Sequence, residues 1–329
     1  MMKPLLPYEK IKREILVKKE SKISEKYGST PEKRDIKELL NTGVICINKP
    51  RGPTSHQISE FVQKILGIKK AGHSGTLDPK VTGVLVVTLD KGTKAAQGLL
   101  KAGKEYIGIM HLHKEISEKQ VKDVFEKFTG RIKQIPPLKS AVKRAARFRK
   151  IYYLEILEID EKDVLFRVGC QAGTYIRKLC HDIGQDLGIG AHMAELIRTK
   201  VGTFDIDGSH TLQDLKDAYY YYTEKGDSRM LSKMIFPIER AVEHLGKVYV
   251  HDNVVFPLTH GARLNAPGIA KVETEIQKDD FIAVMTLKGE FICYGDAMMS
   301  SKEMVAVERG LAVKTSNVYM DPDVYPKIV

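Results

Sequence analysis

The stretch AGHSGTLDPKVTGVLVV, residues 71–87, places a single carboxylate, Asp78, among glycines and other small residues. The apolar run from Val84 to Leu89 that follows it predicts a buried strand. Asp78 therefore lies on a loop that enters a central strand, a place where a rigid scaffold often positions functional groups.

Three interpretations of this loop compete. Asp78-Pro79 can be a simple turn that the glycines permit. A glycine-rich loop can also cradle phosphate, but the GxxxxGK[ST] order is missing and the loop follows a helix instead of a strand. In the third, Asp78 is a catalytic carboxylate, and the small residues let a bulky substrate approach.

The residues around the loop predict mixed helices and strands. GVICINK (residues 43–49) reads as a buried strand. A helix capped by Thr54 or Ser55 follows, with Ile58, Phe61, Val62, Ile65 and Leu66 on one face and Gly67 at its end. Farther on, residues 104–113 read as a strand and 118–130 as a helix, and residues 151–188 as two strands, a loop and a helix. Without a regular βαβ alternation, the expected fold is α+β on a mixed or antiparallel sheet.

AHMAELIRTKVGTFDI (residues 191–206) is expected to be a helix and then a strand.

The domain organisation follows from a change of pattern along the chain. Beyond residues 243–247 the pattern becomes β-rich, from KVYVHDNVV onward, and TLKGEFI predicts a hairpin. We expect an N-terminal arm over residues 1–38, a catalytic domain over 39–247 and a small β-barrel-like module over 248–329.

The composition points to a nucleic-acid partner. The chain has 329 residues and a net charge of +11, and such a protein prefers polyanions. Positive charge concentrates in KSAVKRAARFRK, which holds no acidic residue and predicts a basic arm that grips RNA. Its cations are Lys139, Lys143, Arg144, Arg147, Arg149 and Lys150. A solvated helix face is the simpler alternative.

Other features bound the location and the chemistry. No apolar run approaches the length of a membrane span, and the charged first residues do not resemble a secretory signal, so we expect a cytoplasmic protein. The four cysteines show no CxxC spacing, which predicts reduced structural thiols and no metal site.

A lone carboxylate needs a partner that keeps it ionised and aimed. GTYIRKL, residues 173–179, offers Arg177 as an ion-pair partner and Tyr175 as an aromatic face, and GKEY supplies Tyr106. Aromatic faces beside a carboxylate in a basic protein favour an unstacked nucleobase and chemistry at the bond between sugar and base. The structural alternatives are core tyrosines and a surface ion pair.

Several motifs together resemble a known family. GHSGTLDPKVTGVL resembles the signature of the TruB family of pseudouridine synthases, with Asp78 at the position of the catalytic aspartate. KEY, PPLKSAVKR, GTYIRKLCHDIGQDLG and AHMAELIRTKVGTF follow in family order. LLNTGVICINKPRGPTSH, HGARLNAPGI and VYMDPDVYPK resemble the archaeal members of the dyskerin branch, the catalytic subunits of box H/ACA ribonucleoproteins, whose C-terminal module is a PUA domain.

The resemblance implies isomerisation of uridine to pseudouridine without metal or organic cofactor. It implies catalytic roles for Asp78, Tyr106, Tyr175 and Arg177, and a substrate pocket that includes His73, Gly75, Thr76 and Leu196. His260, Gly261 and Arg263 of the PUA module are expected to bind RNA. Family members often carry two arginines before the threonine of LIRTKVG, whereas here Ile197 stands at the first position and Arg198 remains.

The resemblance also implies partners. These are a box H/ACA guide RNA, ribosomal and transfer RNA substrates, a zinc-ribbon protein, a small β-barrel protein and a kink-turn-binding protein. Two other hypotheses stay open: an RNA-binding scaffold that has lost its chemistry, and a DNA glycosylase that would release a free base.

Overall fold

The structure is a computed structural model that describes residues 4–136 and 145–327. Its larger sheet has ten strands, and the main path runs β11-β2-β4-β9-β5-β8-β7-β6, with β3 beside β4 and β10 beside β9. All strand pairs of this sheet are antiparallel except β4 with β9, so the expected mixed sheet is confirmed. The strands are β2 (Val44–Lys49), β3 (Ala71–His73), β4 (Thr82–Leu89), β5 (Lys104–Leu112), β6 (Gly130–Gln134), β7 (Arg147–Asp160), β8 (Asp163–Cys170), β9 (Ala191–Val201), β10 (Phe204–Asp205) and β11 (Ile235–Phe236).

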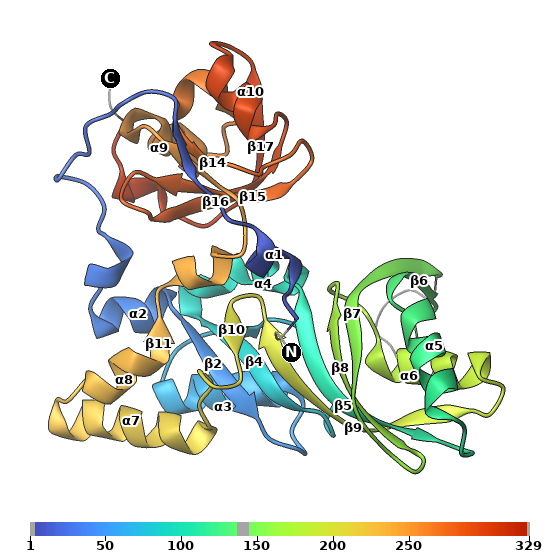
Figure 1. Ribbon diagram of the computed structural model, residues 1–329. Helices are drawn as coiled ribbons and strands as arrows, with labels where there is room; N and C mark the ends of the chain where they lie inside the picture. Colours follow the sequence, from blue (N-terminus) through green and yellow to red (C-terminus); the bar gives the residue numbers. More distant parts are fainter. Residues whose placement is uncertain (1–3, 137–144, 328–329) are drawn as a thin grey trace.

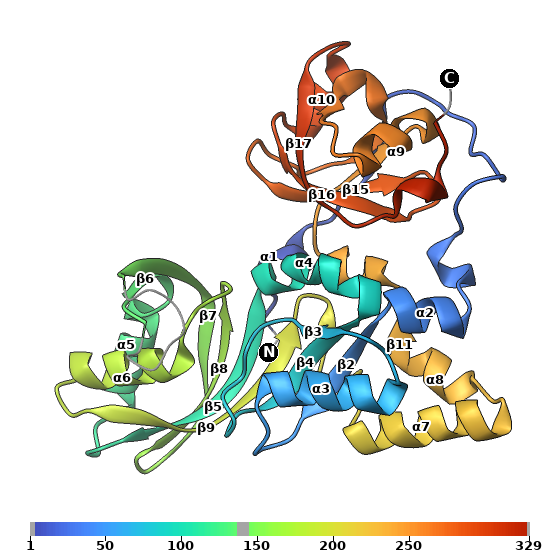
Figure 2. The ribbon, with the colours of Figure 1, turned by 180° about the vertical axis from the view of Figure 1, so that it is seen from behind.

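Helices flank this sheet at its two ends (Figure 1). One group lies beside β2 and β11, and a second group lies beside β6 to β8. The first group comprises α2 (Ile36–Thr42), α3 (Ser55–Leu66), α7 (Leu212–Lys225) and α8 (Arg229–Met234), and the second α5 (Glu118–Lys127) and α6 (Ile176–Asp186). The short α4 (Ala96–Lys101) and the 3-10 turns η2 (Asp90–Ala95) and η3 (Ile238–Val242) lie on the side that faces the second sheet (Figure 2).

Helix α3 forms as its sequence predicts, with one exception. The Thr54 hydroxyl accepts a hydrogen bond from the Gln57 amide at 3.2 Å, and the Gln57 side-chain oxygen accepts one from the Thr54 amide at 2.8 Å. Gly67 ends the helix at a φ of +62°, which favours glycine. Phe61 was expected on the apolar face, but its side chain is 37% exposed. The buried face is made by Ile58, Val62 and Leu66.

Two expected elements are wrong. Residues 191–201 form one long strand, β9, in place of a helix followed by a strand, because pairing with β5 along its length outweighs the helix preference of Ala, Met, Glu and Leu. In KVYVHDNVV only Lys247–Val250 is a strand (β12), and helix α9 (Asp252–Thr259) follows. The predicted helix over 118–130 ends at Lys127, and Gly130 already begins β6.

The C-terminal part of the chain builds a second sheet of seven strands in the order β1-β14-β12-β15-β16-β17-β13. The predicted hairpin is formed by β15 and β16. The new strands are β1 (Ile15–Val17), β13 (Leu264–Asn265), β14 (Ile269–Glu273), β15 (Phe281–Thr286), β16 (Phe291–Ala297) and β17 (Leu311–Val318), and they are accompanied by α10 (Ser301–Ala306), η4 (Ala266–Gly268) and η5 (Pro322–Val324).

The N-terminal segment contacts both sheets. Helix α1 (Pro7–Lys10) places Glu9 2.5 Å from the Lys200 ammonium of β9. Strand β1 then pairs with β14 of the second sheet, and Arg34, just after η1 (Pro31–Lys33), makes two hydrogen bonds to Glu239 at 2.7 and 3.0 Å. Residues 1–38 were expected to be an arm or a loosely packed extension, whereas these parts of the segment are tied to the body.

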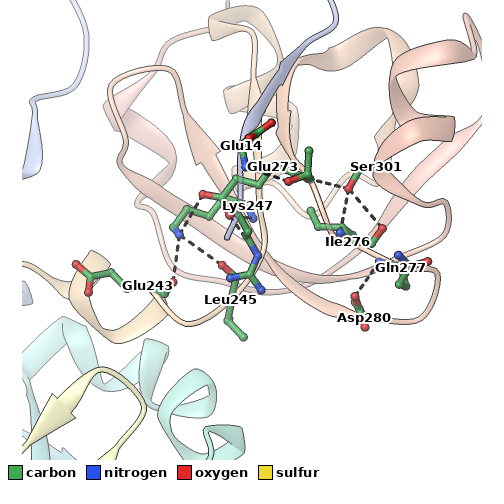
Figure 3. A network of polar contacts seen from close by, with 11 residues as sticks. Glu14, Glu243, Leu245, Lys247, Glu273, Ile276, Gln277, Asp280 and Ser301 are labelled. Carbon is green, nitrogen blue, oxygen red and sulfur yellow. Dashed lines mark hydrogen bonds and ion pairs between the residues drawn. The ribbon is translucent and has the colours of Figure 1, made fainter. Parts of the chain in front are cut away.

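A polar network joins the two parts of the chain where β12 begins (Figure 3). Lys247 donates to the carbonyls of Glu243 and Leu245 at 3.3 and 3.4 Å and to the Glu273 carboxylate at 3.3 Å. Ser301 donates to the Glu273 carbonyl at 2.7 Å. The network links residues 243–247, which follow the ten-stranded sheet in the chain, to β14 of the second sheet.

Within the described ranges, no helix is long and apolar enough to cross a membrane.

Candidate functional site: a cleft around Asp78

A cleft of about 550 Å³ opens on the ten-stranded sheet, between the loop that enters β4 and the start of α6. Five parts of the chain meet there: that loop, the end of α4, β5, the segment at the start of α6, and β9. The lining residues are Gly75, Thr76, Leu77, Asp78, Val81, Leu100, Lys104, Tyr106, Gly173, Thr174, Tyr175, Ile176, Arg177, Met193, Leu196 and Arg198.

Asp78 and Arg177 form an ion pair at the mouth of this cleft, through Oδ2 and Nη2. Their side chains are 49% and 55% exposed, so both remain accessible to a substrate. The pairing predicted from the sequence is therefore present. An arginine in this position keeps a carboxylate ionised and limits the directions in which it points.

The loop that carries Asp78 is anchored on both sides of the carboxylate. The Leu77 amide donates to the Ser55 hydroxyl at 2.7 Å, just before Asp78. Just after it, the ammonium of the fully buried Lys49 donates to the carbonyls of Pro79 and Val81 at 3.2 and 2.8 Å. Asp78 is thus an exposed carboxylate on a loop whose backbone is fixed on both sides by the buried Ser55 and Lys49 side chains. From the sequence, Ser55 was considered only as a helix cap and Lys49 was given no role.

The small residues of this loop answer a steric need. Gly83 has a φ of +100°, and a Cβ there would lie 2.2 Å from the Arg198 carbonyl oxygen. Gly75 has a φ of +121° and lines the cleft. Gly83 therefore permits close approach between β4 and β9, and Gly75 permits a positive φ that larger residues rarely adopt.

Tyr106 lies on β5 directly opposite Arg198 of β9. Its ring is buried at the cleft wall, and this burial raises the pKa of its hydroxyl, an effect that Arg198 opposes by charge and by a hydrogen bond. The Tyr106 hydroxyl is therefore protonated at neutral pH. The Tyr106 ring forms a flat aromatic part of the cleft wall.

Tyr175 lies immediately before α6 and is half-buried in the cleft wall. Its backbone is held by Gln134 of β6, which accepts from the Tyr175 amide at 3.0 Å and donates to the Tyr175 carbonyl at 3.1 Å. Gln134 is a buried residue that sequence reasoning missed. It ties the β6–β7 hairpin to the segment that carries Tyr175 and Arg177.

Leu196 and Arg198 project from alternate positions of β9 into the same cleft. Arg198 is 1% exposed. Its Nε donates to the Val84 carbonyl at 2.7 Å, and its Nη2 donates to the Gly75 carbonyl at 3.2 Å. Arg198 thus fastens the Asp78 loop to β4. No role was assigned to Arg198 from the sequence. Residues two positions apart share one face of a strand, so Arg198 and Leu196 are expected on the same face only once residues 191–201 are known to form β9.

Of the three other residues expected in the pocket, two line the cleft and one does not. Gly75 and Thr76 line the cleft, whereas His73 lies on β3 beside it. His73 accepts from the Gly75 amide at 3.3 Å, and burial, with the positive charge of Arg198, lowers the pKa of its imidazole. His73 is therefore a neutral support of the loop.

The predicted RNA-binding residues fall into two groups. Arg147, Arg149 and Lys150 lie on β7, at the end of the sheet that is near α6; Lys139, Lys143 and Arg144 lie outside the described residues. His260, Gly261 and Arg263 are exposed on the turn between α9 and β13, on the second sheet's part of the chain.

The four cysteines are buried thiols. Cys46, Cys170, Cys180 and Cys293 are buried and unbonded to one another, and burial raises the pKa of each thiol to about 12. Over residues 4–136 and 145–327, no group of three or more His, Cys, Asp or Glu side chains has the arrangement of a metal site.

Family profiles match the chain along most of its length. The N-terminal domain of TruB family pseudouridylate synthases matches residues 63–176, and the C-terminal domain of tRNA pseudouridylate synthase B matches residues 177–243. A PUA domain matches residues 246–319, and a DKCLD (NUC011) domain matches residues 5–59.

Whole-chain relatives agree with these matches. The chain is 52% identical to "Probable tRNA pseudouridine synthase B" of Methanopyrus kandleri, over 98% of this chain and 95% of that protein. It is 51% identical to the protein of the same name from Pyrococcus furiosus, over 98% and 96% of the two chains.

Solved structures are similar over the same length. The structure described as "Crystal Structure of a Cbf5-Nop10-Gar1 Complex" contains a chain with 51% identity and a TM-score of 0.92, and the match covers 98% of each chain. "Structure of H/ACA RNP bound to a substrate RNA containing 2'-deoxyuridine" contains a chain with 48% identity and a TM-score of 0.89, covering 98% of this chain and 99% of that one. This protein therefore belongs to the TruB family of pseudouridine synthases and carries a C-terminal PUA domain.

Proposed function

We propose that the cleft around Asp78 is the active site of this pseudouridine synthase and that its substrate is a uridine flipped out of an RNA strand. The observation that carries the proposal is the ion pair of Asp78 with Arg177 in a cleft walled by Tyr106. An extruded base needs a concave site and an aromatic face, and both are present.

In the proposed reaction, Asp78 attacks the ribose C1′ or removes the proton at C2′. The C1′–N1 bond breaks, its electron pair stays on N1 of the uracil, and the base turns within the cleft. C5 then bonds to C1′. On the first route the bond between Asp78 and C1′ breaks as this bond forms, and on the second route Asp78 returns the proton to C2′. The proton on C5 is then lost and N1 takes up a proton. The product is an isomer of the substrate, so no metal or organic cofactor is required.

The other residues of the cleft take supporting roles. Arg177 aims the Asp78 carboxylate. Tyr106 stacks on the base, and its protonated hydroxyl faces Arg198. Tyr175 and Leu196 shape the pocket, Gly75 and Thr76 admit the RNA backbone, and His73 supports the loop.

Positive side chains outside the cleft hold the RNA. Arg147, Arg149 and Lys150 on β7 lie on the hairpin that Gln134 ties to the cleft, and we assign Lys139, Lys143 and Arg144 to the same arm from the sequence. His260, Gly261 and Arg263 bind RNA on the PUA domain. We propose the domain limits 1–38, 39–247 and 248–329 that were expected from the sequence.

The partners follow from the similarity to a protein solved with Nop10, Gar1 and an H/ACA substrate RNA. We infer that this chain works with a box H/ACA guide RNA, a zinc-ribbon protein, a small β-barrel protein and a kink-turn-binding protein. Its substrates are ribosomal RNA under guide direction and a uridine in the T-arm of transfer RNA, and it acts in the cytoplasm.

The proposal is tested by digesting treated RNA to nucleosides and separating them by chromatography. The protein, supplied with guide RNA and accessory proteins, should convert uridine to an isomer of unchanged mass, and Asp78→Asn should bind RNA but form none. Release of free uracil would indicate a glycosylase. RNA binding without any conversion would indicate a scaffold.

A further inference from the structure

Lys104 is a buried cation at the edge of the cleft to which the mechanism above assigns no role. It is the first residue of β5, lines the cleft and is 6% exposed. Its ammonium lies within hydrogen-bond distance of the carbonyl oxygens of Leu99, Leu100 and Ala102, at 3.2, 3.3 and 3.0 Å.

These three carbonyls explain how a charge is kept there. They stand at the C-terminal end of α4, where helix carbonyls carry partial negative charge. The Leu99 carbonyl also accepts a hydrogen bond from the Ala102 amide at 3.2 Å. The ammonium has three N–H donors, one for each of them. Burial lowers the pKa of Lys104 to about 7, with the positive charge of Arg198 as the second cause. Below that pH the cleft therefore holds a desolvated cation whose position is set by three hydrogen bonds.

The charges that line the cleft do not cancel. Of its lining residues within the described ranges, Lys104, Arg177 and Arg198 are positive and Asp78 is negative. Arg177 is paired with Asp78, so Lys104 and Arg198 are left as two positive charges next to the site of reaction. Both are almost fully buried, where solvent screens a charge least.

An anion is what the reaction creates in this cleft. When the C1′–N1 bond breaks, the bonding electron pair leaves with the uracil, which becomes a negatively charged ring until C5 bonds to C1′. Preorganised positive charge favours such a state because it needs no rearrangement at the moment of reaction. The same charge also favours the ionised form of Asp78.

We propose that Lys104, together with Arg198, provides the positive field that stabilises the detached uracil anion. This inference rests on the proposed function. Lys104 acts at a distance as a positioning and electrostatic residue, since its donors are directed to the end of α4. Its carbon chain lies near Gly75 of the Asp78 loop, where an added Cβ would be 3.7 Å from the Lys104 Cε.

The structural and electrostatic roles can be separated with two neutral variants. Lys104→Gln keeps two N–H donors for the α4 carbonyls and loses the charge, whereas Lys104→Met loses both. Lys122→Met removes an exposed lysine of α5, a helix that contributes no residue to the cleft lining, and serves as the matched control for the loss of one charge.

The test compares two substrates in single-turnover reactions at pH 6, with guide RNA and accessory proteins present. One RNA carries uridine at the target and the other carries 5-fluorouridine, whose electron-withdrawing fluorine makes the base a more stable anion. Consumption of the N-linked nucleoside reports cleavage of the C1′–N1 bond in both. A field that stabilises the anion matters less when the base stabilises its own charge.

Removing one donor that contacts a developing anion typically costs 10²–10³-fold in rate, so this indirect charge should contribute about 10- to 100-fold. Lys104→Gln should therefore slow the uridine substrate by that factor and the 5-fluorouridine substrate at least about fivefold less, with RNA affinity and melting temperature near those of the parent and of Lys122→Met.

Three outcomes would overturn the inference: equal slowing of both substrates by Lys104→Gln, no slowing by that variant, or slowing only in Lys104→Met together with a lower melting temperature. Each would leave Lys104 as a structural cap of α4. If the parent protein converts neither substrate, the proposed function fails instead, and the parent reaction distinguishes the two failures.

Discussion

Gln134 holds both backbone polar groups of Tyr175 with one side-chain amide. Its Oε1 accepts from the Tyr175 amide at 3.0 Å, and its Nε2 donates to the Tyr175 carbonyl at 3.1 Å. The start of α6, and with it Arg177, therefore depends on a residue of β6 that is 43 positions earlier in the chain. The β6–β7 hairpin is coupled to the Asp78–Arg177 ion pair through this side chain.

Replacing Gln134 tests this coupling. Gln134→Leu should lower the free energy of unfolding by about 1–3 kcal/mol, because the Tyr175 amide loses this acceptor, while the Tyr175 carbonyl retains the hydrogen bond from the Leu179 amide at 2.9 Å. It should also lower the single-turnover rate, because the segment with Tyr175 and Arg177 is no longer held. Chemical denaturation and rate measurements on the same preparation check both effects.

Gln134→Glu serves as the graded control. Its carboxylate can still accept from the Tyr175 amide but cannot donate to the Tyr175 carbonyl at neutral pH, so its effect should lie between those of the parent and Gln134→Leu. A parent-like rate in Gln134→Leu would show that this contact does not position the site.

The Asp78–Arg177 pair should matter for chemistry and little for stability. Both side chains are about half exposed, and exposed ion pairs contribute below about 1 kcal/mol. Arg177→Ala should therefore leave the thermal transition almost unchanged while slowing turnover by about 100-fold or more, since the carboxylate loses the group that aims it. A large drop in melting temperature in this variant would identify the pair as structural.

His244 should make the fold sensitive to acid. Burial lowers the pKa of its imidazole from 6.5 to about 4, so the unfolded chain binds a proton at a higher pH than the folded chain does. The contribution of His244 to stability is complete above pH 6.5 and is lost as the pH falls toward 4, a change of about 3 kcal/mol over that window.

The measurement is the free energy of unfolding of the parent and of His244→Phe between pH 7 and pH 4. Phenylalanine keeps an aromatic ring against Tyr8, with which His244 makes an edge-on contact. The difference between the two proteins should shrink or change sign as the pH falls. A difference that is constant with pH would contradict a neutral buried His244.

The arm on β7 should contribute electrostatically to RNA binding. If Arg147 and Lys150 each contact one phosphate, replacing either with alanine should lower the slope of log affinity against log salt by about 1. Lys122→Ala, on α5, is the matched control and should leave the slope unchanged. Binding titrations at several salt concentrations decide between these results.

Much of the fold around the site could be predicted from local signals. The cap at Thr54, the stop at Gly67 and the apolar run of β4 are short-range patterns, and they place Asp78 on its loop correctly. The ion pair with Arg177 was also predicted, although nothing in the spacing of the two residues places them in contact.

The back of the cleft could not be predicted, because it depends on pairing between distant strands. Arg198 lies opposite Tyr106 only because β9 is a strand in register with β5, and the local sequence of β9 favours a helix. The supports Lys49, Ser55 and Gln134 act on backbone groups of loops far away in sequence. Such partners become visible only when the chain is folded.

The proposed function depends on Asp78. The decisive measurement is the release of tritium from RNA labelled at C5 of uridine, made with transfer RNA and with guide-paired ribosomal RNA, with and without guide RNA. The parent protein should release tritium as the C5 hydrogen is lost, and Asp78→Asn should release none while it binds the same RNA with similar affinity. Tritium release by Asp78→Asn at a rate near that of the parent would contradict a catalytic role for this carboxylate.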